Sequence, residues 1–463
     1  MSDEGLRQAQ ELMAADGLPP QAIAVFSRFY RDLESGATGM VHEADIDPLQ
    51  DVTALADVQI GDDEQRSALA QTAIIKLNGG IGTSMGMEQA KSLLPVRGAL
   101  SFLDVIVRQV LHLRQTHDVA LPLVFMNSFR TRDDTLRTLA GYPELAIDGL
   151  PADFLQNREP KLRADDLTPA QWPADPSMQW CPPGHGDLYT ALSTSGILEA
   201  LLDKGFRYAS VSNSDNLGAA PDPRIAGWFA ASGAPYAAEV CTRTAADVKG
   251  GYLVVRKADG RLVLRETAQT PKEEVALADD ITRHRYFHTN NLWFDLRVLA
   301  DTLTERDGVL GLPLIRNAKT VDPSDSSSTP VIQIESAMGA AVEVFDGAVA
   351  LQVPRSRFLP VKTTNDLLLV RSDVYRLDER GRLVSDLPAG ADDPLVDLDS
   401  RFFKLVKGFE QRFPAGPPSL RHARSLTVRG DWTFGAEVTA RGDAVLAERD
   451  SPGTVPDGTV LGD

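Results

Sequence analysis

The sequence predicts an α/β protein with a mixed, mostly parallel sheet, helices on both sheet faces, and a smaller β-rich unit at the C-terminus. Two observations lead to this prediction. Between residues 72 and 216, short apolar runs alternate with amphipathic segments, a pattern typical of parallel strands connected by helices. In residues 425–463, short valine-centred runs are separated by Gly-Asp and Pro-Gly turns, which favours a small β-helix or β-roll.

Composition limits the classes of protein that the chain can represent. Its 463 residues are too many for one compact core, so two or three domains are expected. The formal net charge of -18 argues against general binding to nucleic acid or to a membrane surface. No apolar run is long enough to cross a bilayer, and the acidic N-terminus is neither a signal nor a transit peptide. Because Cys181 and Cys241 fit no disulfide framework or metal motif, we expect a cytoplasmic protein.

The first expected region, residues 1–65, is helical. Residues 19–36 carry apolar side chains at helical spacing and end at Gly36; these side chains are Ile23, Phe26, Phe29 and Tyr30. Residues 55–68 are polar and are expected to form a connection.

The second expected region, residues 66–385, carries the alternating pattern. Its helix at 101–117 begins with a capping box of Ser101 and Asp104. The other elements expected in its first half are strand 72–78, strand 121–128, helix 130–141, helix 196–205 and strand 206–216. From residue 236 strands become more frequent, and the turn at 257–260 predicts a hairpin. Residues 319–330 and 387–400 are a loop and a linker by composition, and 400–463 form the expected β-helix-like domain.

A glycine-rich stretch follows the first strand of this region: residues 76–92 read KLNGGIGTSMGMEQAKS. The Walker A pattern fails here because Ala90 precedes the lysine and Met85 replaces the first glycine. The dinucleotide pattern also fails, since its third glycine is one residue late, at Gly86. Asp104 lies at about the distance expected for a ribose-binding acid, but the capping box accounts for it. A tight strand-to-helix turn without any ligand stays open as the plain structural explanation.

A flexible glycine loop with a lysine at its far end can still bind phosphate through backbone N–H groups and one compact positive charge. A second polar cluster, residues 213–216 (NSDN), follows the strand expected at 206–216. Ligands of such sheets bind at the carboxyl ends of the strands, so both segments are candidates for one site.

These residues resemble the signature of UTP–glucose-1-phosphate uridylyltransferases, also called UDP-glucose pyrophosphorylases, of the eukaryotic type. Further similar segments occur in the expected order between about residue 70 and about residue 376: LPLVFMNSFRTRDDT, WCPPGHGDLYTAL, SVSNSDNLGA, FHTNNLWFDL, VIQIESAMGAAVEVF and VPRSRFLPVKTTNDLLLVRSDVY. The resemblance implies a Rossmann-like nucleotidyltransferase core. Departures are Ala90, where the family usually has proline, and residues 87–90, which replace a short glycine-containing stretch.

The resemblance implies a reaction in which the phosphate of glucose 1-phosphate attacks the α-phosphate of UTP, giving UDP-glucose and pyrophosphate. No protein nucleophile is needed, so catalysis is expected to consist of positioning and charge neutralisation. The family's two phosphate lysines correspond to Lys91 and Lys362, and its Mg²⁺ ligand corresponds to Asp215; an Asx turn is the structural alternative for Asp215. For Arg355 and Arg357, phosphate contacts and ion pairs are equally open.

The resemblance also assigns the binding residues. Those implied for the uridine nucleotide are Leu77, Gly79, Gly80, Lys91, Gln156, Gly184 and His185, with the glutamine amide suited to the uracil edge. Those implied for the sugar are Asn213, Gly251, Glu266 and Asn290. A cross-strand ion pair is the structural alternative for Glu266, and a turn is the alternative for Asn290.

Rival functions stay open at this point. A related enzyme acts on N-acetylhexosamine 1-phosphates, but its loop has arginine and leucine where this chain has Ser84 and Met85. A broader UDP-sugar pyrophosphorylase would also accept galactose 1-phosphate. An inactive nucleotide-sugar sensor on the same fold would have lost the lysines or the metal ligand, which this chain retains. No nucleic-acid or membrane partner is expected, and the C-terminal domain is a possible surface for homo-oligomers.

Overall fold

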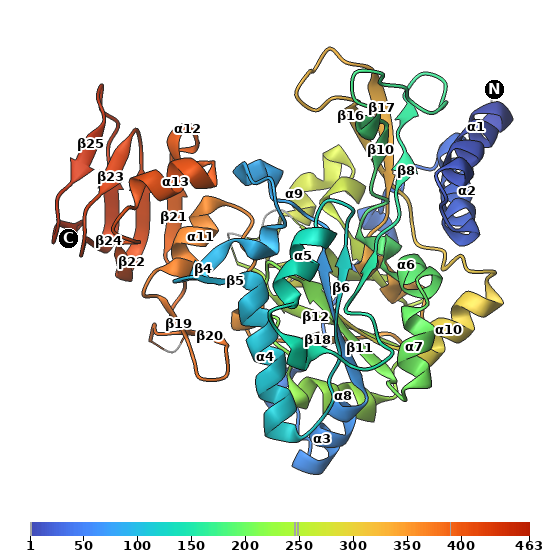
Figure 1. The fold of residues 1–463 in the computed structure, drawn as a ribbon, viewed down its shortest axis with the longest axis horizontal. Helices are drawn as coiled ribbons and strands as arrows, with labels where there is room; N and C mark the ends of the chain where they lie inside the picture. The colour runs from blue at the N-terminus through green and yellow to red at the C-terminus, as the bar shows by residue number, and fades with distance from the viewer. Residues whose placement is uncertain (1, 245–246, 248–249, 389) are drawn as a thin grey trace.

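A large mixed sheet forms the centre of the computed structural model, which describes residues 2–244, 247, 250–388 and 390–463 (Figure 1). Eleven strands belong to this sheet. Its main path runs through β2 (Thr53–Ala54), β18 (Val349–Gln352), β12 (Tyr236–Thr242), β15 (Tyr286–Asp295), β11 (Tyr208–Asn213), β3 (Thr72–Asn78), β6 (Leu123–Asn127) and β7 (Asp153–Leu155). All neighbours on this path are parallel except β15, which is antiparallel to β11 and β12.

Helices cover both faces of the sheet because its strands are apolar on both sides. Along β3, Ile74 faces one buried cluster while Ala73 and Ile75 face the other. The first cluster includes side chains of α3 (Asp62–Ala70), α4 (Phe102–His117), α5 (Arg132–Leu139), α8 (Pro223–Ser232) and α11 (Thr364–Arg371). The second includes side chains of α1 (Ser2–Ala15), α2 (Pro20–Glu34), α6 (Leu188–Thr194), α7 (Ile197–Asp203) and α10 (Leu296–Glu305). The mostly parallel α/β core predicted from the sequence is confirmed.

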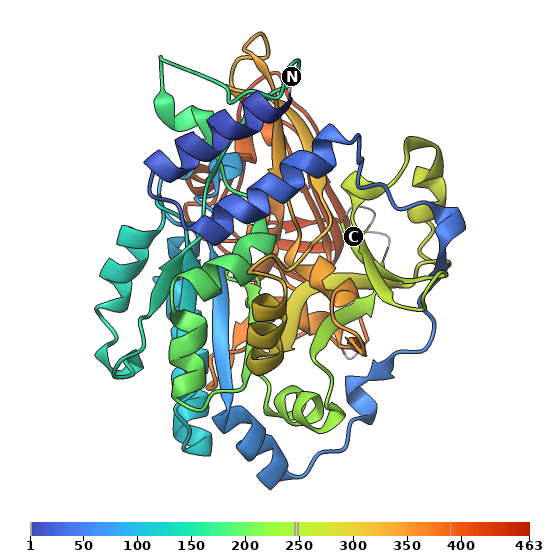
Figure 2. The same ribbon diagram turned by 90° about the vertical axis from the view of Figure 1, so that its right-hand side faces the viewer.

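Smaller antiparallel pieces extend the sheet on the side of β15. The hairpin β13 (Tyr252–Arg256) and β14 (Leu262–Arg265) joins β15, and β1 (Ile46–Pro48) pairs with β13. A separate hairpin of β16 (Ile315–Thr320) and β17 (Pro330–Glu335) extends to β9 (Leu162–Arg163). The N-terminal helices α1 and α2 lie across the molecule in Figure 2. In the part of the chain that the structure describes, no helix has the length and apolarity to span a bilayer.

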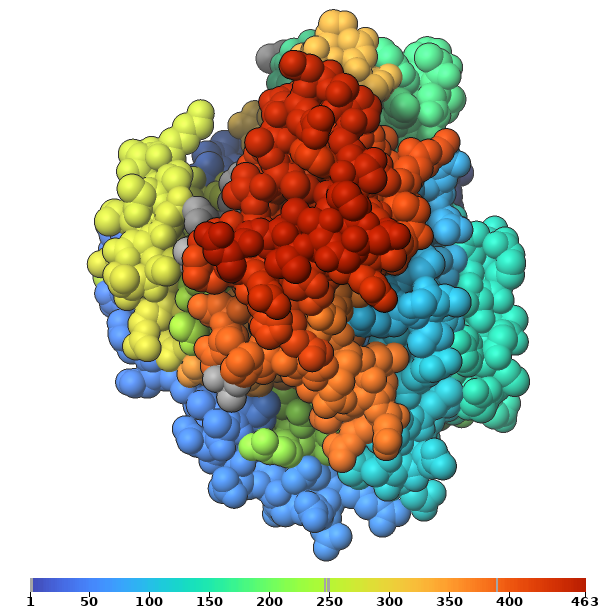
Figure 3. Space-filling view, turned by 90° about the vertical axis from the view of Figure 1, so that its left-hand side faces the viewer, coloured from blue at the N-terminus to red at the C-terminus, as the bar shows by residue number. Residues whose placement is uncertain are grey.

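The C-terminal strands lie at the opposite end from α1 and α2 and cover the face seen in Figure 3. Two parallel sheets form here, one of β21 (Leu395–Leu398), β22 (Ser419–Val428), β24 (Thr439–Leu446) and β26 (Val460–Leu461), the other of β23 (Trp432–Phe434) and β25 (Gly453–Val455). Helices α12 (Ser400–Phe403) and α13 (Val406–Arg412) connect β21 to β22. The finer assignment as a β-helix-like domain, and the three domain boundaries, stay predictions.

Two local predictions were wrong. Residues 55–68 were expected to be a polar connection, but they contain most of α3, whose first turn carries three acids that favour a helix N-terminus and whose Ala68 and Leu69 are buried. The expected linker at 387–400 includes β21, because pairing with β22 gives these residues a sheet partner far along the chain. Within that linker, residue 389 lies outside the described residues.

Candidate active site

The glycine loop and the NSDN segment meet at the carboxyl ends of two neighbouring strands. β3 and β11 are parallel, with Leu77 opposite Asn213. Just beyond this pair, both the backbone N–H and the hydroxyl of Ser214 donate to the carbonyl of Leu77, at 3.0 and 2.7 Å. Two segments far apart in sequence are thereby joined by backbone geometry, as the topology of a parallel sheet predicts.

The glycine loop then turns back on itself. Gly82 and Gly86 have φ values of 68° and 71°, a left-handed conformation that glycine adopts without steric cost. Lys91 N donates to Gly80 O at 3.1 Å, which closes the loop and returns the lysine to the strand end. These glycines are therefore needed to form the turn, and the turn places Lys91 at the strand end.

Lys91 and Asp215 form an ion pair in this structure. The distance from Lys91 Nζ to Asp215 Oδ2 is 2.6 Å, and the two side chains are 16% and 21% exposed. The predicted phosphate lysine and the predicted metal ligand are thus each other's counterion. A partly exposed pair of this kind can be exchanged for ligand charges, because solvent already screens it in part.

Lys362 reaches the same place from a distant part of the chain. Val361 N donates to Asp215 O at 3.1 Å, and Leu359 N donates to the Asn216 side chain at 2.8 Å. The Lys362 side chain is exposed and has no ion pair among the described residues.

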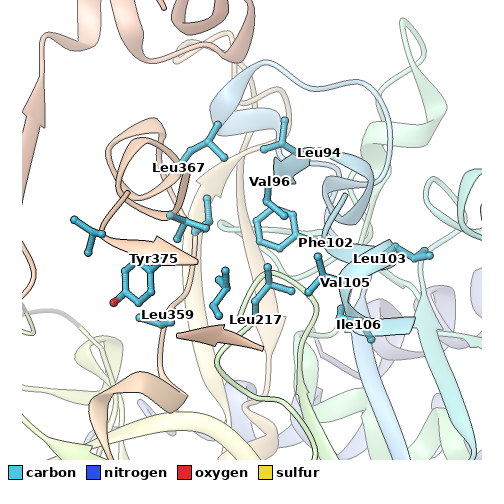
Figure 4. Close-up of a cluster of buried hydrophobic side chains, with 14 of the residues drawn as sticks. Leu94, Val96, Phe102, Leu103, Val105, Ile106, Leu217, Leu359, Leu367 and Tyr375 are labelled. Carbon is cyan, nitrogen blue, oxygen red and sulfur yellow. The ribbon is translucent and has the colours of Figure 1, made fainter. Parts of the chain in front are cut away.

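A buried apolar cluster holds together the segments that carry the three charged residues. Each charged residue has a leucine close to it in sequence: Leu94 lies three positions after Lys91, Leu217 two positions after Asp215, and Leu359 three positions before Lys362. All three leucines belong to one cluster (Figure 4). The neighbouring side chains Val96, Phe102 and Tyr375 are drawn with them. The convergence of the charges thus rests on core packing as well as on backbone hydrogen bonds.

Arg355 and Arg357 are held in ion pairs, which decides between the two roles left open for them. Arg355 contacts both carboxylate oxygens of Asp247 at 2.5 and 2.7 Å. Arg357 contacts both oxygens of the buried Glu239 at 2.7 and 2.8 Å. Bidentate pairs of this geometry occupy the guanidinium fork, so these arginines are structural in this conformation.

Among the residues assigned to uracil, Gln156 lies directly against Gly79. A Cβ on Gly79 would lie 2.8 Å from Gln156 Oε1, so only glycine lets the glutamine amide approach this closely. The next residue, Asn157, is fixed by Asp187, whose carboxylate accepts from the Asn157 backbone at 2.6 Å and from its amide at 2.7 Å. Burial raises the pKa of Asp187 to about 7. Asp187 therefore ties the Gln156 segment to the loop that carries Gly184 and His185.

His185 is a neutral hydrogen-bond donor in this site. Met338 N donates to His185 Nδ1 at 2.9 Å, so the ring proton is on Nε2. Burial lowers the pKa of His185 to about 4, so the ring is uncharged near neutral pH. It can donate to a phosphate or a hydroxyl, and it is a poor general acid or base at that pH.

A cavity of about 340 Å³ adjoins these residues. It is lined by six of the predicted residues: His185, Asn213, Gly251, Glu266, Asn290 and Lys362. Glu266 lies over Gly251, where a Cβ would come within 2.8 Å of Oε1. Burial raises the pKa of Glu266, and the nearby positive charge of Lys362 opposes this effect. Lys91, Asp215 and the residues assigned to uracil are outside the lining of this cavity.

Sequence reasoning missed several residues of the site. The cavity is also lined by Asn216, His288, Asn317 and Glu335, and Asp187, two residues after the lining residue His185, holds Asn157. Asn317 and Glu335 belong to the β16–β17 hairpin, of which only the intervening loop was predicted. Asp187 could have been suspected from its place directly after the GHG turn. His288 gives no such signal, because its position in a strand looks like that of any half-buried residue.

Comparison with known proteins shows the family of the chain. The family profile described as UTP–glucose-1-phosphate uridylyltransferase matches residues 23–441. The uridylyltransferase of that name from Saccharomyces cerevisiae is 41% identical over 86% of this chain and 78% of its own, and that from Solanum tuberosum is 41% identical over 86% and 81%.

Solved structures are similar over nearly the whole chain. The UDP-glucose phosphorylase of Trypanosoma brucei is 42% identical, with a TM-score of 0.91 over 99% of this chain and 98% of that one. A variant of the UDP-glucose pyrophosphorylase of Leishmania major in complex with UDP-glucose is 40% identical, with a TM-score of 0.92 over 99% and 98%. The chain belongs to the UTP–glucose-1-phosphate uridylyltransferase family.

Proposed function

We propose that this chain transfers the uridylyl group of UTP to glucose 1-phosphate, forming UDP-glucose and releasing pyrophosphate. The observation that carries the proposal is the convergence of Lys91, Asp215 and Lys362 beside a cavity whose lining is polar and of sugar size. An inactive sensor would not need two lysines and a carboxylate at the junction of a nucleotide loop and a sugar cavity.

In the proposed reaction, a phosphate oxygen of glucose 1-phosphate attacks the α-phosphorus of UTP. The bond between the α-phosphorus and the bridging oxygen breaks, and pyrophosphate leaves with that oxygen. Repulsion between the two anions is the main obstacle, so the protein's contribution is to hold them in line and to place positive charge beside them. We assign this charge to Lys91 and Lys362.

Asp215 fits a Mg²⁺ ligand. Mg²⁺ usually takes one or two carboxylates and completes its shell with substrate phosphates and water, and Asp215 is a partly exposed carboxylate where the triphosphate would lie. Within the described residues, no group of three or more His, Cys, Asp or Glu could hold a metal alone, which fits an ion that arrives with its nucleotide. When bound, Mg²⁺ would neutralise phosphate charge. Asp215 would then no longer depend on Lys91 as its counterion, and Lys91 could contact the triphosphate.

The binding roles follow the same division. The backbone at Leu77, Gly79 and Gly80 and the side chain of Gln156 would read uracil, while Gly184 lets the chain approach the ligand and His185 donates from Nε2. Asn213, Glu266 and Asn290 would contact sugar hydroxyls, with Gly251 leaving room for the Glu266 side chain.

The test is pyrophosphate release from UTP and glucose 1-phosphate in the presence of Mg²⁺. Asp215→Ala should lower kcat by at least about 100-fold, since it removes a carboxylate from the reacting phosphates. Asp133→Ala, which removes an exposed carboxylate on α5, is the matched control and should match the wild type. Equal activity of Asp215→Ala and wild type would remove Asp215 from the mechanism.

Substrate choice is tested in the same assay with glucose, galactose and N-acetylglucosamine 1-phosphates. We expect glucose 1-phosphate to give the highest kcat/KM. A higher kcat/KM for N-acetylglucosamine 1-phosphate would contradict the proposal. Equal values for galactose 1-phosphate and glucose 1-phosphate would support a broader UDP-sugar pyrophosphorylase.

We also propose that the outer face of the C-terminal sheet joins copies of this chain. Leu395, Val445 and Val460 are 65%, 61% and 53% exposed on β21, β24 and β26. Light scattering of the full chain, with Val445→Asp as the variant, tests this: a wild-type monomer would contradict it. Both cysteines are free and buried, which fits the reducing cytoplasm that we propose as the compartment.

A further inference from the structure

A local irregularity in β15 brings Asn290 to the sugar cavity. β15 pairs with β12 in regular register at both ends, with Leu292 opposite Ala238 and His288 opposite Val240. Between these pairs, three residues of β15 face the single residue Glu239, so the strand bulges outward. Asn290, at the centre of the bulge, has a φ of 58° and lines the cavity.

The two neighbours of Asn290 are tied to the sheet. Thr289 Oγ1 donates to the Glu239 carbonyl at 2.8 Å, and Asn291 Nδ2 donates to the Glu239 carboxylate at 3.0 Å. Thr289 and Asn290 both line the cavity, but Asn290 is the residue of the bulge whose side chain has no hydrogen bond to Glu239 among the described residues. A left-handed conformation is costly for any residue with a Cβ, and such strain persists only where the surroundings enforce it.

One ring nitrogen of His288 holds Asn290 in this left-handed conformation. Its Nδ1 lies 3.2 Å from Asn290 N and 3.1 Å from Asn290 Oδ1. A backbone N–H can only donate, so Nδ1 is the unprotonated nitrogen, and burial agrees with this by lowering the pKa of His288 to about 4. Amide oxygen and nitrogen are interchangeable in shape, so an accepting Nδ1 selects the Asn290 amide nitrogen and leaves the oxygen for the cavity.

The imidazole itself cannot move away. His288 is 3% exposed, and a Cβ on Gly339 would lie only 2.6 Å from its Cε1. Its Nε2 is buried without a partner among the described residues, a cost that a simple core residue would avoid.

We propose that His288 is a positioning residue for the sugar: it fixes the left-handed bulge and the amide orientation of Asn290, so that the Asn290 oxygen accepts from a hydroxyl of glucose 1-phosphate. This inference rests on the proposed function, since it deepens the role of Asn290. It predicts that His288 acts on sugar binding and leaves nucleotide binding unchanged.

The test compares His288→Asn with His288→Leu. Asparagine carries an oxygen on the same carbon that carries Nδ1 in histidine, so it keeps an acceptor for Asn290 N–H, whereas leucine puts a methyl group there. We expect His288→Leu to raise the KM for glucose 1-phosphate about tenfold, as for one lost hydrogen bond, with the KM for UTP changed less than twofold. His288→Asn should stay within about twofold of the wild type on both constants. His288→Gln, which moves the polar group one carbon further, replaces His288→Leu if that variant does not fold.

Asn290→Gly separates positioning from general packing. Glycine adopts a φ of 58° without strain, so the thermal midpoint of the Asn290→Gly variant should equal or exceed that of the wild type. The KM of this variant for glucose 1-phosphate should rise. Combining it with His288→Leu should raise this KM no further, because both changes remove one contact. Additive effects, or equal rises in both KM values for His288→Leu, would overturn the inference. A wild type that makes no UDP-glucose would instead overturn the proposed function.

Discussion

The nucleotide edge and the sugar cavity lie side by side but are built from different kinds of structure. The nucleotide edge, where we propose that UTP binds, comprises Leu77–Lys91, Gln156 and Gly184–Asp187. Leu77–Lys91 and Gln156 lie at the carboxyl ends of the parallel strands β3 and β7, and the edge is rich in glycine. The cavity that we assign to the sugar is bounded by the β13–β14 hairpin, the β15 bulge and the β16–β17 hairpin, and most of the residues that line it are polar or charged.

The nucleotide edge and the sugar cavity also differ in their ionisable groups. The nucleotide edge, where we propose that the triphosphate binds, holds Lys91, whose charge is balanced by Asp215 in this structure. The cavity that we assign to the sugar is lined by His288 and by His185 of the nucleotide edge, and burial lowers the pKa of both to about 4. It is also lined by the carboxyls of Glu266 and Glu335, whose pKa values burial raises. Backbone suits a flat base and a phosphate, whereas hydroxyl groups in fixed directions need individually placed side chains.

The largest expected effect is at the junction of the two halves, where we propose that Lys91 and Lys362 contact the reacting phosphates. Lys91→Ala and Lys362→Ala should each lower kcat by about 100-fold or more, because their charge counts most as the α-phosphorus is attacked. The Kd for UTP should weaken less than kcat falls. Lys272→Ala, which removes an exposed lysine elsewhere, is the control. A variant with weak UTP binding but normal turnover at saturation would show that its lysine acts in binding alone.

A pair of substitutions sharpens the division between the two halves. Gln156→Ala should raise the KM for UTP about 10- to 100-fold, as for one lost hydrogen bond to a buried polar edge, and leave the KM for glucose 1-phosphate within about twofold. Glu266→Gln should do the reverse. Steady-state kinetics with each substrate varied in turn gives all four constants. If both variants changed both constants equally, the two halves would be one coupled site.

The nucleotide edge was easier to predict from the sequence than the sugar cavity, because it lies at the ends of parallel strands. Lys91 and Asp215 were predictable because strand ends at one edge of a parallel sheet must meet, and the strands themselves are clear apolar runs. Their 2.6 Å ion pair was not, because it depends on the path of the glycine loop. The ion-pair partners of Arg355 and Arg357 lie more than a hundred residues away, and no local pattern points to them.

The sugar half was predicted only through resemblance. Its residues come from hairpins whose register depends on tertiary packing, so the spacing of Gly251, Glu266 and Asn290 carries no signal of their proximity. His288 is the extreme case, since its effect acts through a bulge that no period-2 pattern reveals. Helix α3 was missed for a related reason: only two of its residues, Ala68 and Leu69, are buried, too few for a visible periodicity.

A smaller effect is the pH dependence of stability that Asp187 gives to the nucleotide edge. Burial raises the pKa of Asp187 from 3.8 to about 7, so the folded protein binds a proton that the unfolded chain releases between these values. Stability contributed by this group therefore falls as pH rises from about 4 to 7 and is constant above 7. Compared with Asp187→Asn, the wild type should lose about 1.4 kcal/mol of unfolding free energy per pH unit between pH 5 and 7. Urea unfolding at pH 5, 6, 7 and 8 measures this, and parallel profiles for the two proteins would contradict it.

The smallest expected effect concerns the mobility of the nucleotide edge, at Ala90. Its φ of -52° lies in the range that proline imposes, and its N–H donates no hydrogen bond among the described residues. Ala90→Pro should therefore raise the free energy of unfolding by about 0.4–1 kcal/mol, chiefly by restricting the unfolded chain, and slow hydrogen exchange in Gly82–Gly86. Ala90→Val adds similar bulk at this buried position without fixing φ, so it should bring no gain. If the loop must open for nucleotide entry, only the proline variant should lower kcat, and by less than the lysine substitutions do, since it changes the rate of a motion and leaves every charge in place.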